Sequence, residues 1–335
     1  MVRCRFQARQ IAVGSVLLGR RLEQGVWVVQ KGQDRSAVAA MLIVGYAGII
    51  GFTDNFVQLI AAEAGLWQFH ATRSAMAAGL LALAVPVLGL RLWPRNLRAV
   101  LGRSVLHGMA MLIYFGALAF LPVAIVAAGL FTAPIFVLII QRFAYGKPIT
   151  PWQIAAVLFG FGGVILVLGP AAMAEASLAA VLPVLAGAMY AMGNIATRAW
   201  CAEESAETLL AGFFVVLGLF GAAGMAVLSL HPIAGPDGPA GFLQRGPVWP
   251  SGTFVFWTFV QAAGSLVAIG LMIRAYQMTE AARASVMEYA ILPAAAFWAW
   301  VIWGQGLDPL AVLGMAMIVA AGVAILRRPR GVVDG

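Results

Sequence analysis

The chain has 335 residues, of which 62% are hydrophobic and only 10% are charged. An ordinary soluble domain is about 25% charged, so the composition excludes a water-soluble globular protein as well as a disordered or fibrous chain. The net charge of +8 does not indicate nucleic-acid binding, because no basic patch alternates with aromatic residues. The class that remains is an all-α integral membrane protein.

Ten apolar runs are long enough to cross the hydrocarbon core, which takes about 20 helical residues. They fall at residues 37–62, 68–90, 104–120, 123–141, 151–169, 179–199, 207–230, 253–273, 281–303 and 309–326. Residues 1–36 are not expected to span, because their apolar run is short and is interrupted by Arg20 and Arg21. We interpret them as a cytoplasmic segment, with a true start near Met41 as the alternative.

Basic residues gather on one side of these spans. With the N-terminus in the cytoplasm, all but Arg73 and Arg245 of the 21 Lys and Arg residues fall in cytoplasmic segments or adjoining span ends. The positive-inside rule therefore predicts that both termini are cytoplasmic. Cys4 and Cys201 then both lie on the cytoplasmic side, so no disulfide and no thiolate metal site is expected.

The ten spans divide into two similar sets of five. Pro134 precedes Gly163 by 29 residues, and Pro293 precedes Gly322 by the same 29. Chance similarity between apolar strings is the alternative to a duplication. Because five is odd, duplicated halves enter the membrane in opposite senses, as in the inverted repeats of secondary transporters. The predicted parts are an N-terminal segment 1–36, a first repeat 37–169, an outside linker 170–178, a second repeat 179–327 and a cytoplasmic tail 328–335.

Three stretches carry a family resemblance: ALAFLPVAIVAAGLFTAPIFVLII continuing into GFGGVILVLG, MTEAARASVMEYAILPAAAFWAWVIWGQGLDP, and FHATR at the start of the second span. In their order and spacing, over about 37–327, they resemble the drug/metabolite transporter superfamily of the EamA type. The resemblance implies ten helices in two inverted repeats. The chain lacks the glutamate that the family usually carries after its fourth and ninth helices, since AYGKPIT and WGQGLDP stand there. GFTDN and WQFHATR also resemble bacterial carriers for S-adenosylmethionine or riboflavin.

Three ionisable side chains, Asp54, Arg73 and Glu288, lie well inside predicted spans. Each is a functional candidate, because charges in the membrane are costly. Asp54 and Arg73 lie at similar depths, which predicts either a structural salt bridge or a pair that opens during transport. Snorkelling of Arg73 to the outer interface is a third interpretation. Glu288 is a candidate for proton coupling or for binding a cationic substrate, unless the span register leaves it at the cytoplasmic interface.

Uncharged polar and aromatic residues complete the candidate site. Tyr114, Tyr190, Trp257 and Gln261 come from both halves and are expected to line a central cavity, with packing between helices as the alternative. Trp67, Trp249 and Trp303 lie near span ends, as is typical of interfacial belts.

The histidines do not indicate a metal site. His70, His107 and His231 lack metal-ligand spacing, so no metal and no cofactor is predicted. His70 lies three residues before Arg73 and is interpreted either as an interfacial histidine or as a modulator of the Asp54–Arg73 pair.

These features favour a secondary carrier in a bacterial inner membrane that moves a small organic metabolite or drug-like molecule by alternating access. Gly160, Gly162 and Gly163 do not form a phosphate loop, so transport is expected to use a gradient or to run downhill. The expected partners are the substrate and membrane lipid, without nucleic acid, and the chain is expected to be a monomer or a homodimer. A channel is the main alternative. A membrane-embedded enzyme is disfavoured, because no catalytic constellation is present.

Overall fold

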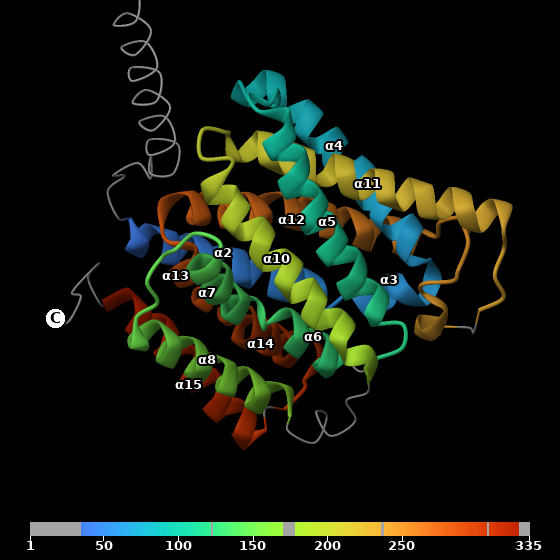
Figure 1. The fold of residues 1–335 in the computed structure, drawn as a ribbon. Coiled ribbons are helices and arrows are strands. Elements are labelled where there is room, and N and C mark those ends of the chain that lie inside the picture. The colour runs from blue at the N-terminus through green and yellow to red at the C-terminus, as the bar shows by residue number, and fades with distance from the viewer. Residues whose placement is uncertain (1–34, 122, 170–177, 236–237, 307, 328–335) are drawn as a thin grey trace, which may run out of the picture. The chain divides into compact units, whose positions relative to one another are not determined.

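The structure is a computed structural model that describes residues 35–121, 123–169, 178–235, 238–306 and 308–327. Within these ranges every regular element is helical and no β-strand occurs (Figure 1). Nearly all of the predicted N-terminal segment and of the linker, and the whole predicted tail, lie outside the described residues. The predicted domain limits therefore stay predictions.

Ten segments of the described chain are long and apolar enough to cross a membrane, with 18–28 residues each. The first five are α2 (Ser36–Asp54) with α3 (Val57–Glu63), α4 (Leu66–Leu88), α5 (Leu97–Ala117), α6 (Val123–Leu130) with α7 (Ala133–Phe143), and α8 (Pro151–Leu168). The second five are η1 (Leu178–Ala180) with α10 (Val181–Ala199), α11 (Ala206–Leu230), α12 (Gly252–Met278), α13 (Ala281–Met287) with η3 (Glu288–Ala290) and α14 (Ile291–Trp303), and α15 (Pro309–Arg327). All ten predicted spans are confirmed as helical segments. A short turn, η2 (Gly238–Gly241), lies between α11 and α12.

The start of α5 differs most from the prediction. The helix begins at Leu97 rather than at residue 104, because the Asn96 side chain accepts the backbone N–H of Ala99 at 3.2 Å. Such a cap satisfies one of the donors that a helix start leaves open. The earlier start places Arg103 nearly two turns inside the helix, instead of at its cytoplasmic end.

The fourth and ninth spans are both interrupted near their middle. Pro134 is the second residue of α7, and Pro293 is the third residue of α14. Proline has no N–H to donate to the carbonyl four residues earlier, here that of Leu130 or Tyr289, which favours a kink or a break at these places. The two predicted repeats therefore break at equivalent places, and Glu288 lies in the second break.

Contacts between the spans are consistent with an inverted repeat. In Figure 1, α8 lies beside α15 and α4 beside α11. Helix α2 packs against α12 and α14, and its expected counterpart α10 packs against α5 and against α6 and α7. Exchanging the two halves leaves the α8–α15 and α4–α11 pairs unchanged and converts the pairs made by α2 into those made by α10. The inverted orientation itself stays an expectation.

Helices α8 and α15 approach each other most closely at glycine. A Cβ atom built on Gly163 would lie 2.6 Å from the carbonyl oxygen of Gly314, and one built on Gly314 would lie 2.5 Å from that of Gly163. Small residues permit such backbone contact between membrane helices. Gly322, which matches Gly163 in the 29-residue spacing, is not part of this contact, because a Cβ atom built on it would meet nothing within 4 Å.

Cys201, in the turn between α10 and α11, is expected to resist thiol reagents. The residue is completely buried, and burial raises the pKa of its thiol to about 11. Because the thiolate is the reactive form, maleimide at pH 7 should label Cys201 only after unfolding. Intact-mass measurement on a Cys4→Ser variant would test this, and rapid labelling of the folded protein would contradict the structure.

Candidate functional site

A cavity of about 640 Å³ is lined by side chains from both halves of the chain. Six of the seven predicted site residues line it, namely Asp54, Arg73, Tyr114, Tyr190, Gln261 and Glu288. The seventh, Trp257, is not among the lining residues. Its ring stacks on that of Phe56, with the centroids 3.6 Å apart, so in this structure it packs against another aromatic ring instead.

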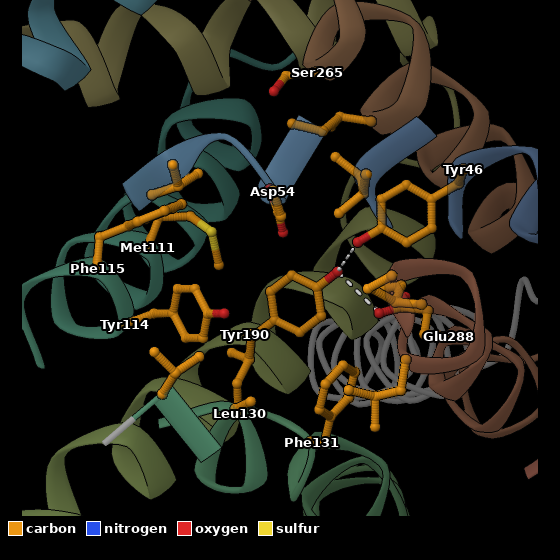
Figure 2. A pocket seen from close by; sticks show the side chains of 18 of the residues that line it. Tyr46, Asp54, Met111, Tyr114, Phe115, Leu130, Phe131, Tyr190, Ser265 and Glu288 are labelled. Atoms are coloured by element: carbon orange, nitrogen blue, oxygen red, sulfur yellow. Dashed lines mark hydrogen bonds between the residues drawn. The ribbon is translucent and has the colours of Figure 1, made fainter. Parts of the chain in front are cut away.

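Glu288 is held at the break of the ninth span by a tyrosine of the sixth. Its carboxylate is buried, and Oε2 accepts a hydrogen bond from the Tyr190 hydroxyl at 2.9 Å. The Tyr190 oxygen also lies 3.4 Å from the hydroxyl of Tyr46 (Figure 2) and 3.0 Å from the sulfur of Met272. Oε1 of Glu288 has no hydrogen-bond partner among the described residues. The Tyr190 hydroxyl therefore links the carboxylate in the helix break to α10, and through Tyr46 to α2.

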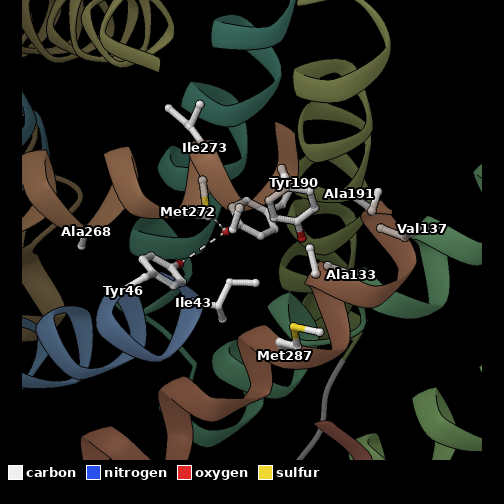
Figure 3. Packing of buried hydrophobic residues seen from close by; sticks show 14 of the residues in the cluster. Ile43, Tyr46, Ala133, Val137, Tyr190, Ala191, Ala268, Met272, Ile273 and Met287 are labelled. Carbon is white, nitrogen blue, oxygen red and sulfur yellow. Dashed lines mark hydrogen bonds between the residues drawn. The ribbon is translucent and has the colours of Figure 1, made fainter. Parts of the chain in front are cut away.

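The polar contacts around Tyr190 are set in an otherwise apolar core. Figure 3 shows Tyr46, Tyr190 and Met272 among buried residues that include Ile43 and Ala133. An apolar surround strengthens the hydrogen bonds inside it and makes unpaired polar atoms costly. The Tyr190–Glu288 bond is therefore a strong constraint on how α10 and the break can move apart.

Asp54 lies at the end of α2, where the first span passes into α3. Its Oδ1 accepts a hydrogen bond from Nε2 of Gln261 at 3.1 Å, and Oε1 of Gln261 accepts one from Ser265 at 3.2 Å. The bond between Asp54 and Gln261 joins the first span to the eighth, and the bond from Ser265 lies within the eighth. Asp54 and Gln261 are thus brought together, as residues that share a cavity wall.

The expected Asp54–Arg73 ion pair is not formed. Arg73 makes no hydrogen bond and no ion pair with any described residue, and it packs instead against aromatic rings. Similar depth in the membrane did not imply contact, because α4 packs chiefly on α11 and α12 rather than on α2. His70 is also fully buried, and its interfacial position stays a prediction.

A second buried network was missed by the sequence analysis. Arg103 lines the cavity, is completely buried and donates from Nε to Thr197 at 3.0 Å and from Nη1 to the Leu209 carbonyl at 3.2 Å. Nearby, Nε2 of His107 lies 2.9 Å from Oδ1 of Asn194. The sequence signal that could have found Arg103 is Asn96. As a helix cap, Asn96 predicts an earlier start of α5, which places Arg103 inside the span.

A polar cluster closes the end of the bundle where most arginines lie; we call it the Ser36–Thr279 cluster. The Ser36 and Thr279 hydroxyls lie 2.9 Å apart, Arg283 donates to Ser36 at 3.4 Å, and Arg198 donates to the Thr279 carbonyl. Arg283, counted as a topology signal, is therefore largely buried at this end. The cluster joins the ends of α2, α10, α12 and α13.

The cavity extends away from this cluster and reaches the surface at the other end. Its lining near the cluster stops at buried Ser285, whereas at the other end it includes the exposed residues Leu59, Val123 and Gln305. Helices α7 and α13 pack together on the cluster side, while α6 and α14 both contribute to the cavity wall. Among the described residues, no group of His, Cys, Asp and Glu could hold a metal ion.

Comparisons with known proteins find similarity to membrane transporters. Residues 37–169 match the EamA-like transporter family. A protein of Pseudomonas aeruginosa named pseudopaline exporter CntI is 24% identical over 264 residues, covering 77% of this chain and 85% of its own. A protein of Rhizobium johnstonii named riboflavin transporter is 25% identical over 232 residues, covering 68% of this chain and 69% of its own. A solved crystal structure with 18% identity covers 86% of this chain and 98% of its own with a TM-score of 0.69, which supports the fold.

Proposed function

Because residues 37–169 match the EamA-like transporter family, we propose that this chain is a secondary transporter that carries a small organic molecule across a bacterial inner membrane by alternating access. The observation that carries the proposal is the cavity between the two halves, closed at one end by the Ser36–Thr279 cluster and reaching the surface at the other. A cavity with one closed end is what a carrier needs, whereas a channel needs a continuous pathway.

The broken helices support a change between two states. The cluster-side halves α7 and α13 pack together, and the opposite halves α6 and α14 line the cavity. Rocking of one five-helix unit against the other would separate α7 from α13 and bring α6 and α14 together. With the arginine-rich end in the cytoplasm, as the positive-inside rule indicates, this structure corresponds to a carrier that opens to the outside.

Glu288 is the residue that we propose couples transport to protons. It lies in the break of the ninth span, lines the cavity and bonds to Tyr190 of the sixth span. A proton on this carboxylate changes which groups Tyr190 can donate to, and so changes the contact between the break and α10. Carboxylates facing a cavity inside the membrane are common in proton-driven carriers.

Transport itself is tested by substrate exchange in vesicles. A thermal-shift screen of the purified protein, covering amino acids, nucleoside-like metabolites, vitamins such as riboflavin, and quaternary amines, would supply the ligand. In proteoliposomes, we expect uptake of the labelled ligand to saturate and to be accelerated by unlabelled ligand inside. Flux that rises linearly with concentration and ignores internal ligand would indicate a channel, and no flux of any bound ligand would refute transport.

A matched pair of variants tests the location of the pathway. Tyr190→Trp puts a larger ring into the cavity and should slow exchange by roughly tenfold, which corresponds to about 1.4 kcal/mol added to the transport barrier. Phe143→Trp makes a similar enlargement at a residue that is 84% exposed and outside the cavity lining. Exchange by the Phe143 variant should be unchanged, and equal rates for both variants would contradict this pathway.

A further inference from the structure

Arg73 is a buried cation that forms no hydrogen bond and no close ion pair with a described residue, although the charge of Asp54 acts on it at longer range. Its side chain is 4% exposed, and its Nε atom is buried without a hydrogen bond. The guanidinium carbon lies 5.0 Å from the ring centre of Phe69, 5.8 Å from that of Phe115 and 6.0 Å from that of Phe214. Ring faces stabilise a desolvated cation by about 2 kcal/mol, but they leave its N–H donors unused.

The neighbouring polar atoms on α4 are also unsatisfied. Both ring nitrogens of His70 and the hydroxyl of Ser74 are buried without hydrogen bonds among the described residues. These residues lie three positions before Arg73 and one after it, but neither of them lines the cavity, so a ligand in the cavity reaches Arg73 among the three. An unpaired buried polar group costs about 1–3 kcal/mol, which favours a ligand that supplies acceptors here.

The other buried arginine of the cavity is occupied. Arg103 donates from Nε to Thr197 and from Nη1 to the Leu209 carbonyl, which holds its guanidinium between helices, and only its Nη2 atom is buried without a partner among the described residues. Asp54 is likewise bonded to Gln261 and forms no ion pair with Arg73. Arg73 is thus the arginine of the described lining that makes no hydrogen bond and no ion pair, so its whole guanidinium is available to a ligand.

We propose that Arg73 is the subsite for a carboxylate group of the transported molecule, which makes the substrate an organic acid with an apolar or aromatic body. This rests on the proposed transport function. The planar guanidinium matches a carboxylate in a two-pronged hydrogen bond. One available guanidinium matches the single charge of a carboxylate better than the charge of about −1.5 to −2 that a phosphate group carries at neutral pH.

Matched acids and esters test the subsite in the purified full chain. The probes are 3-phenylpropanoate, L-tryptophan, L-glutamate and citrate, each with its methyl ester, with riboflavin as a probe that carries no carboxylate. We expect at least one acid to raise the thermal unfolding midpoint and its ester to do so much less. Equal effects of acid and ester, or no effect of any acid, would overturn the proposal.

Variants then assign the effect to Arg73. Arg73→Gln should weaken binding of the stabilising acid on the order of 10- to 100-fold, as expected for hydrogen bonds to a charged group. Arg73→Lys, which keeps the charge without the planar fork, should bind it with intermediate affinity and serves if the glutamine variant does not fold. Arg91→Gln, at an exposed position outside the cavity lining, should match the unmodified protein. Unchanged acid binding by both Arg73 variants would overturn the proposal.

The same experiments separate this inference from transport. If riboflavin or another probe without a carboxylate is exchanged across vesicles while no acid binds, the transport function stands and the Arg73 subsite falls. If an acid binds in an Arg73-dependent way but is never exchanged, the subsite stands and the transport function falls.

Discussion

Replacing Glu288 with glutamine is expected to abolish proton-driven accumulation while leaving substrate exchange in place. Glutamine has nearly the same shape and keeps an oxygen that can accept the hydrogen bond from Tyr190, now made at 2.9 Å. It cannot gain or lose a proton. The variant should therefore fold and bind substrate, but a proton gradient should no longer bias the direction of transport.

The size of this effect follows from the energy of the gradient. One pH unit stores about 1.4 kcal/mol per proton, which supports roughly tenfold accumulation when one proton moves with each substrate. The unmodified protein should change the ratio of internal to external substrate by about that factor per pH unit, and Glu288→Gln should leave the ratio near one. Accumulation of labelled substrate in proteoliposomes with an imposed pH gradient measures it.

Asp54→Asn is the matched control for this prediction. Asp54 lines the same cavity and is bonded to a side-chain amide, but it lies at the end of α2 rather than in the break of the ninth span. We expect coupling to survive in this variant. Accumulation by Glu288→Gln at the normal level would remove Glu288 from the coupling role, and loss of accumulation only in Asp54→Asn would transfer that role to Asp54.

The sequence predicted the spans well, because crossing a membrane requires a long apolar run, and that property is local. Most of the ten predicted segments agree with the helices within a few residues. The exception, α5, shows the limit of hydropathy: the stretch from Leu97 to Arg103, with its two arginines, is helical, because the cap at Asn96 and packing against α10 and α11 hold it. An interpretation based on apolarity alone therefore assigned a buried arginine to the cytoplasm.

The contacts within the site could not be predicted in the same way. Which residues face the cavity was largely foreseen, since intramembrane charges and polar rings are costly unless they face one another or a cavity. Their partners were not, because the pairing of Glu288 with Tyr190 depends on where α10 lies relative to the break 98 positions later in the chain. Helical depth places a residue along the membrane normal, but the direction in which it points depends on packing. The absent Asp54–Arg73 pair is the clearest example.

The α8–α15 contact gives a prediction about stability that needs no ligand. Gly163→Ala should destabilise the protein by about 1–3 kcal/mol, the typical cost of overpacking. The new methyl group would meet the Gly314 carbonyl at 2.6 Å, and a helix backbone cannot move aside as a side chain can. The thermal unfolding midpoint in detergent, followed by tryptophan fluorescence, should fall.

Gly162→Ala is the control, because it makes the same chemical change one residue earlier in the same helix. Its methyl group would meet only the terminal methyl of Met317 at 3.4 Å, which is the flexible end of a side chain. Alanine also favours a helix over glycine by about 1 kcal/mol, so this variant should be as stable as the unmodified protein or slightly more so. Since helix propensity changes equally in both variants, the difference between them isolates the backbone contact. Equal midpoints would mean that α8 and α15 are not packed at Gly163 and Gly314 as the structure has them.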